Sequence, residues 1–190
     1  MNKWLPAVLL LLLISCKEKD QDPERKFIPI RSFFENQVAD VDTSLYPIIR
    51  LDFVDSSRTD TSYIRREDFR ALAADFLKLP DISDKKYSSQ YREETLVDSM
   101  LDRVIISYVP INPEKSLIQR QEMLIKPSLG NDQVKSIIVD YLINNRDSIV
   151  RKRMLWQMDR SFQVTTMKQK KGEPETISTM KVVWNEPETQ

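Results

Sequence analysis

The sequence predicts a single α+β domain in which two N-terminal helices pack on a meandering antiparallel sheet of about seven or eight strands. Three observations carry this prediction. Apolar residues recur at helical spacing before residue 80, seven strand-length segments follow residue 90, and short polar clusters separate those segments. Consecutive strands joined by short connections are antiparallel neighbours, so the second half of the chain is expected to form a meander.

The first half of the chain alternates helix and strand signals. Residues 27–42 predict a helix, because Ile30, Phe33, Phe34, Val38 and Val41 lie on one helical face. Residues 45–54 predict a strand, and 61–64 a short partner strand across a polar turn. A second helix is expected around Phe69, with apolar side chains on one face and Pro80 at its end. Its apolar positions are Phe69, Leu72, Ala73, Phe76 and Leu77.

The second half of the chain predicts strands only. Their expected ranges are 93–97, 103–111, 116–125, 134–144, 149–158, 162–169 and 176–184. The strands at 103–111 and 134–144 are apolar on both faces, which is typical of strands covered on both sides. The helices are expected to cover one face, and the sequence leaves open what covers the other.

The first sixteen residues predict where the protein is located. Lys3 precedes an apolar run over 4–14, which is shorter than the roughly 20 residues of a membrane-spanning helix. Residues 1–15 therefore predict an export signal. The closing residues Leu13, Ile14, Ser15 and Cys16 resemble the lipobox of bacterial lipoproteins, which implies cleavage before Cys16 and attachment of lipid, palmitate included, to that cysteine. The alternatives are an ordinary secretory signal and an N-terminal membrane helix.

The residues after Cys16 make the predicted location more specific. Residues 16–26 are charged and predict a disordered tether, which leaves 27–190 as the folded domain. The lipoprotein resemblance implies the outer membrane, because Lys17 stands where an inner-membrane retention signal has aspartate. The lysine followed by acids is also similar to the surface-export signal of Bacteroidota lipoproteins. The periplasmic or cell-surface side is left open.

Composition excludes several function classes. The chain has 29 basic and 29 acidic residues, and no basic patch with interleaved aromatics, so no nucleic-acid partner is expected. It has no histidine, which removes His-dependent catalysis and nearly all zinc sites. Two glycines are too few for a phosphate-cradling loop. The single cysteine excludes an internal disulfide, and we expect no cofactor and no bound metal.

Several short patterns are candidate sites. Two Ser-x-x-Lys matches begin at Ser83 and Ser178, but the companion motifs of penicillin-binding enzymes are missing. Paired carboxylates, the residues that a glycosidase needs, occur at Asp40/Asp42, Asp52/Asp55 and Glu93/Glu94. Ser99 and Ser148 follow aspartates in a pattern that resembles the O-glycosylation acceptor of Bacteroidota proteins.

An apolar face on the late strands is the remaining candidate site. It consists of Met154, Trp156, Met158, Met180, Val182 and Trp184. One interpretation is that this face packs in the core. The more specific interpretation is a curved sheet that holds a lipid or another apolar ligand. We expect a non-enzymatic binding or envelope-assembly lipoprotein, held by its lipid and binding an apolar ligand or an envelope protein. The alternatives are a carboxylate-dependent hydrolase of envelope polymers and a structural subunit of an envelope complex.

Overall fold

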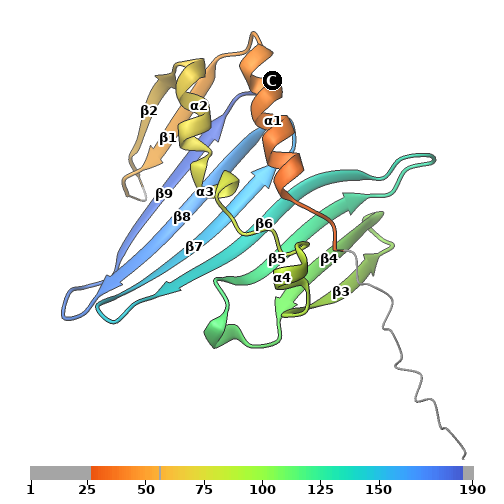
Figure 1. Cartoon of the computed structure of the whole chain (residues 1–190). Coiled ribbons are helices and arrows are strands. Elements are labelled where there is room, and N and C mark those ends of the chain that lie inside the picture. The colour runs from red at the N-terminus through yellow and green to blue at the C-terminus, as the bar shows by residue number, and fades with distance from the viewer. Residues whose placement is uncertain (1–26, 56, 186–190) are drawn as a thin grey trace, which may run out of the picture.

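A computed structural model describes residues 27–55 and 57–185 of the chain. This part forms one antiparallel sheet with helices on one side of it (Figure 1), which confirms the α+β class. The helices are α1 (Arg31–Thr43), α2 (Arg66–Leu72), α3 (Ala74–Leu77) and α4 (Lys85–Ser88), with a 3-10 turn η1 (Pro113–Lys115). The strands are β1 (Ile48–Phe53), β2 (Thr59–Ile64), β3 (Tyr91–Asp98), β4 (Arg103–Pro110), β5 (Ile118–Lys126), β6 (Gln133–Asn144), β7 (Ser148–Gln157), β8 (Ser161–Lys170) and β9 (Thr176–Val183). The signal, Cys16 and the tether predicted for residues 1–26 lie outside the described residues.

The sheet has nine strands, in the order β2-β1-β9-β8-β7-β6-β5-β4-β3. Each of the seven late strands lies beside its neighbour in sequence, so the predicted meander is confirmed. The predicted count of seven or eight strands is too low, because the β1–β2 hairpin extends the same sheet. β1 pairs with β9 in the register Ile49↔Val183, and β2 becomes one edge.

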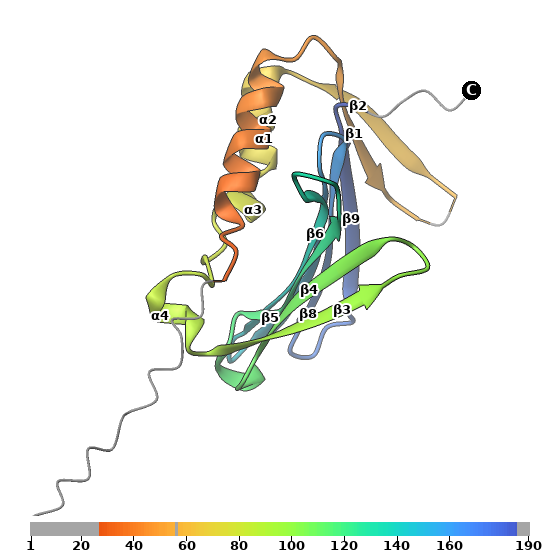
Figure 2. The same cartoon turned by 90° about the vertical axis from the view of Figure 1, so that its right-hand side faces the viewer.

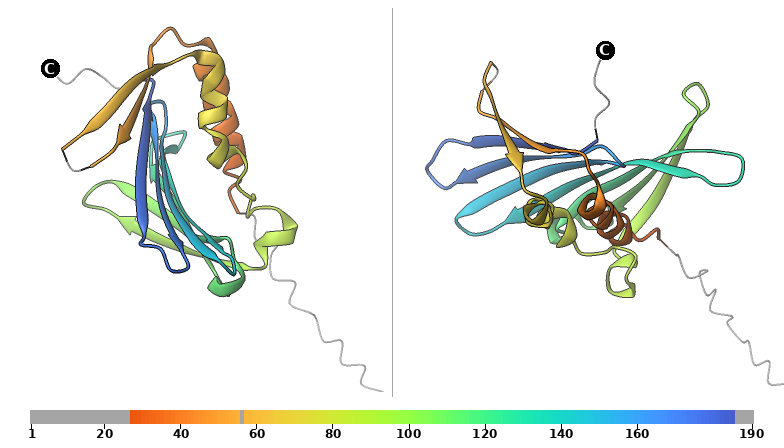
Figure 3. Two further views of the ribbon diagram at one scale, coloured as in Figure 1. Left: turned by 90° about the vertical axis from the view of Figure 1, so that its left-hand side faces the viewer. Right: turned by 90° about the horizontal axis from the view of Figure 1, so that it is seen from above.

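The helices are not gathered at the N-terminus as predicted, because α2, α3 and α4 lie between β2 and β3. These two strands are the opposite edges of the sheet, about 38 Å apart at ~4.8 Å per strand spacing. The chain must therefore cross the whole sheet, and α2 to α4 make this crossing on the side where α1 also lies (Figures 2 and 3). Among the described residues, no helix is long and apolar enough to cross a membrane.

The helix predicted around Phe69 is divided into α2 and α3. The break falls at Ala73, whose carbonyl oxygen accepts a hydrogen bond from the Phe76 N–H at 3.0 Å. A bond that spans three residues tightens the chain into a 3-10 turn. The predicted apolar face survives this break, because Phe69, Ala73 and Phe76 are all buried.

The core lies between the helices and the concave side of the curved sheet (Figure 2). Trp156 of β7 is at its centre and is fully buried. Its ring centroid lies 5.1 Å from those of Phe34 in α1 and Phe162 in β8, and 4.9 Å from that of Phe76 in α3. Aromatic side chains from both helical segments thus interlock with those of the sheet.

The opposite side of the sheet, which we call the uncovered face, has none of the described helices on it (Figure 3). The prediction that β4 and β6 are covered on both sides is therefore wrong for the described residues. Apolar side chains lie on this face nevertheless, and Ile105, Ile138 and Leu155 are half-buried by their neighbours. Charged residues between them form ion pairs along their own strands, such as Arg92 with Glu94 and Arg120 with Glu122.

Tyr108 of β4 contacts the first described residues of the chain and holds them against the sheet. Its ring centroid lies 4.6 Å from that of Phe27, and its hydroxyl oxygen accepts a hydrogen bond from the Ile28 N–H at 3.2 Å. Burial, with a smaller contribution from the nearby Glu93 carboxylate, raises the pKa of the Tyr108 hydroxyl to about 12, although the hydrogen bond from the Ile28 N–H opposes the shift. The folded protein therefore favours the neutral form of this hydroxyl.

This shift predicts a loss of stability at alkaline pH. An unfolded tyrosine has a pKa near 10, so the contribution is complete below about pH 10 and is lost as the pH rises toward about 12. Between about pH 9 and pH 11.5 we expect the free energy of unfolding to fall by about 2 kcal/mol through this one group. Urea unfolding of wild type and Tyr108→Phe measures it. An equal loss in both proteins would assign the effect to other groups, such as Tyr91, whose pKa burial also raises.

Candidate functional site

The apolar face of the late strands is the core of the domain. Met154, Trp156, Val182 and Trp184 are buried beneath the helices, and Met158 and Met180 are partly buried against the same cluster. The side chains of α1, α2 and α3 occupy the space that an apolar ligand would need. The described structure therefore corresponds to the core-packing interpretation of this face and not to the ligand-facing one.

The carboxylate pairs do not face a common cleft. Asp40 and Asp42 are exposed on α1, Asp52 is paired with Arg50 at 2.7 Å, and Glu94 is paired with Arg92. Hydrogen bonds from the Ser57 backbone, its hydroxyl and the Arg58 backbone hold the pKa of the exposed Asp55 below its usual range, so this group is an ionised turn residue. In the described ranges no group of three or more acids gathers as a metal site would require.

The serine candidates are dispersed over the molecule. The Ser83 hydroxyl donates to the Asp81 carboxylate at 2.7 Å. Ser178 lies in β9, where Ser178 and Lys181 are on opposite faces of the strand. Ser99 is exposed in the β3–β4 turn, whereas Ser148 is half-buried as the first residue of β7. Of the two predicted acceptors, only Ser99 has the exposed turn position that an acceptor requires.

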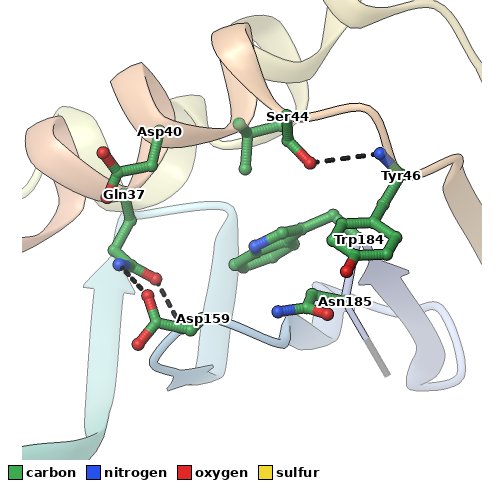
Figure 4. Close-up of a pocket in the computed structure, with 8 residues that line it drawn as sticks. Gln37, Asp40, Ser44, Tyr46, Asp159, Trp184 and Asn185 are labelled. Atoms are coloured by element: carbon green, nitrogen blue, oxygen red, sulfur yellow. Dashed lines mark hydrogen bonds between the residues drawn. The ribbon is translucent and has the colours of Figure 1, made fainter. Parts of the chain in front are cut away.

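A cleft opens at the C-terminal end of α1, where this helix meets the β7–β8 turn and the end of β9 (Figure 4). We call it the Trp184 cleft, and its volume is about 120 Å³. Its lining residues are Gln37, Asp40, Val41, Ser44, Tyr46, Asp159, Trp184 and Asn185. They come from three segments that are far apart in the sequence, so the fold itself creates the cleft.

Two hydrogen bonds between Gln37 and Asp159 form one wall of the cleft. The Gln37 side-chain amide donates from Nε2 to Asp159 Oδ1 at 2.7 Å, and the Asp159 backbone N–H donates to Gln37 Oε1 at 2.6 Å (Figure 4). Asp159 has a φ of 59°, in the left-handed region that aspartate tolerates better than most residues. Its turn therefore presents both a backbone donor and a carboxylate to α1.

The Trp184 ring forms the floor of the cleft. Its centroid lies 5.2 Å from that of Phe69 and 5.5 Å from that of Trp156, so the core fixes its position. The backbone N–H groups of Trp184 and Asn185 donate to the Arg160 carbonyl oxygen at 3.0 and 3.3 Å, which ties the end of β9 to the β7–β8 turn. The Tyr46 side chain, 59% exposed, stands at the rim. The site is thus a rigid floor with polar walls.

Sequence reasoning singled out Trp184 and Asp40 separately and did not bring them together. Gln37, Tyr46, Asp159 and Asn185 were missed altogether. The available signal was local, because Gln37 is a polar residue on the apolar face of its helix and Asp159 occupies the tight turn between two predicted strands. Neither observation indicates that the two side chains meet across 122 residues.

Comparison of the chain with protein-family models, with curated proteins and with solved structures finds no match in any of the three.

Proposed function

We propose that this chain is a lipoprotein of the outer membrane that binds an envelope partner through the Trp184 cleft and catalyses no reaction. The cleft carries this proposal, because it is a preformed recess in which a fixed aromatic floor is bordered by carboxylate, amide and hydroxyl groups. An apolar surface with a few placed polar groups is typical of binding sites. The lipobox resemblance at Cys16 supports the membrane attachment in this proposal.

The arrangement of charged groups supports binding over hydrolysis. A carboxylate-dependent hydrolase needs two acids that converge in a polar cleft, at least one of them with a raised pKa. Asp40 and Asp159 both line the Trp184 cleft, but both are exposed, and Asp159 is already engaged by Gln37. The one acid that is buried among the described residues, Asp81, accepts hydrogen bonds from Ser83 and lies away from the cleft.

The position of the cleft suits a tethered binding module. The described chain begins at Phe27, and α1 rises from there for about 20 Å toward the cleft (Figures 1 and 2). Cys16 lies eleven residues before Phe27, which spans at most about 40 Å when extended. The cleft therefore lies at the end of α1 opposite to the point where the tether joins the described domain, and a tether of this length gives a partner room to reach it.

A second candidate function, a structural subunit of an envelope complex, is favoured by the uncovered face and the two sheet edges. β2 and β3 each have a strand on one side only, and Tyr63 of β2 is 78% exposed on the uncovered face. Against it, β3 carries Arg92, Glu93 and Glu94, and charged residues are a common means of blocking edge-to-edge pairing.

Site-specific photo-crosslinking in living cells distinguishes these two functions. Tyr46 at the cleft and Tyr63 on the uncovered face are exposed tyrosines, so p-benzoylphenylalanine is a matched replacement at both. We expect a discrete adduct with an envelope protein from position 46 and none from position 63. An adduct from position 63 alone would support the structural subunit instead, and no adduct from either position would contradict the binding proposal.

A further inference from the structure

We propose that the Trp184 cleft recognises a primary ammonium group carried by a lysine side chain of a protein partner. This inference rests on the proposed function, since it names the chemistry of the partner at the same site. Four features of the cleft point to it: its charge, its aromatic groups, its size and its position in the domain.

The cleft is acidic. Its lining includes two carboxylates, Asp40 and Asp159, and contains no lysine or arginine. Arg66 lies next to the site, but its guanidinium donates to the carbonyl oxygens of Val41 and Tyr46 at the end of α1. Arg160 follows Asp159 in the β7–β8 turn but is not part of the lining. The two carboxylates are therefore the charged groups of the lining itself, and they favour a cation.

Aromatic rings accompany these carboxylates. Trp184 forms the floor and Tyr46 the rim, and Figure 4 shows the Trp184 ring between the Asp159 turn on one side and Tyr46 on the other. The faces of tryptophan and tyrosine rings attract ammonium ions through their quadrupoles. The rings also contact the apolar stem of a lysine side chain, which a bare metal ion does not offer. Carboxylates and aromatic rings together thus match both parts of a lysine side chain.

The size of the cleft selects one side chain and excludes a large ligand. Sites for drug-sized molecules and cofactors hold about 300 to 1,000 Å³. The Trp184 cleft, at about 120 Å³, admits the end of one long side chain. Because the neighbouring Tyr46 is largely exposed, the remainder of a partner protein has access from outside.

The position of the cleft favours a protein over a lipid head group as the source of the ammonium. Phosphatidylethanolamine also carries a primary ammonium, but it lies in the membrane to which the N-terminal lipid would attach. The cleft lies at the far end of α1 from Phe27, where the described chain begins (Figure 1). A partner protein reaches this end without any reorientation of the domain.

Nuclear magnetic resonance of the full chain in detergent micelles tests this inference. The probes are Nα-acetyl-lysine amide and Nα-acetyl-norleucine amide, which have similar stems and differ in the ammonium group. We expect the lysine probe to shift the Trp184 indole and Asn185 amide signals saturably, and the norleucine probe to leave them unchanged. Equal binding of both probes would show a merely apolar recess and overturn the inference.

Two variants of α1 give a matched comparison. Asp40→Asn removes a carboxylate of the cleft, whereas Asp42→Asn removes one from an exposed position of the same helix outside the lining. Asp40→Asn should lower the affinity for the lysine probe about fivefold, as expected for the loss of one ion pair near the surface. Asp42→Asn should change this affinity less than twofold. An equal loss of affinity in both variants would show that the general negative charge of the helix attracts the probe, and it would contradict a defined site.

The remaining outcomes separate this inference from the proposed function. Stronger competition by phosphatidylethanolamine micelles than by the lysine probe would overturn the lysine assignment in favour of a head group. Lysine binding without an adduct from position 46 in cells would support the ammonium site and contradict the proposed function. An adduct from position 46 without lysine binding would retain the proposed function and overturn the inference.

Discussion

Trp156→Ala is expected to lower the free energy of unfolding by about 4 kcal/mol, within the range of about 3 to 5 kcal/mol measured when a buried aromatic side chain is truncated. The physical reason is the cavity that the change would leave. Trp156 is fully buried, and four aromatic rings surround it, those of Phe34, Phe76, Phe162 and Trp184. Domains of this size are stable by only about 5 to 15 kcal/mol, so the loss is severe. Urea unfolding followed by circular dichroism measures it.

Two controls make this prediction specific. Trp156→Phe keeps an aromatic ring in the cluster and removes the Nε1 donor, which has no hydrogen-bond partner among the described residues, so it should cost much less than the alanine change. Tyr63→Ala on the uncovered face should change stability by less than about 0.5 kcal/mol. If Trp156→Ala cost less than about 1 kcal/mol, the late-strand face would be an open surface, as the apolar-ligand hypothesis requires.

The parts of the fold that follow from local patterns were predictable. Strand-length segments separated by short polar turns predicted all seven late strands, and each of these strands pairs with its neighbour in sequence. The apolar stripe of α1 also predicted its buried face, with Phe34, Val38 and Val41 in the core. These signals act over a few residues, which is the range that one sequence reveals.

The parts that depend on distant contacts were not predictable. Nothing in β1 indicates that it pairs with β9, because either edge of the meander offers the same free backbone groups. The Trp184 cleft depends on the Gln37–Asp159 contact, which exists only after the helices cross the sheet. The burial of Gln121 in the core is a further feature that the sequence does not predict. It is fully buried without a hydrogen-bond partner among the described residues, opposite Tyr108, although its sequence position indicates an ordinary polar strand residue.

The second large effect concerns Cys16. Cys16→Ala is expected to abolish incorporation of a fatty-acid analogue and to release the protein from the membrane fraction, because the acyl chains supply the attachment. Stability of the domain should stay unchanged, since Cys16 lies eleven residues before the first described residue. Lys17→Arg changes the next residue and keeps the thiol, so this matched control should be labelled and retained like wild type.

Labelling and fractionation of wild type, Cys16→Ala and Lys17→Arg together test most directly the claim on which the proposed function depends, that a lipid on Cys16 holds this domain at a membrane. We predict labelled, membrane-bound protein for wild type and Lys17→Arg, and unlabelled, released protein for Cys16→Ala. Protease added to intact cells then shows whether the domain faces the surface or the periplasm. Wild type that incorporates no fatty-acid analogue, or Cys16→Ala protein that is labelled as strongly as wild type, would contradict lipid attachment at Cys16.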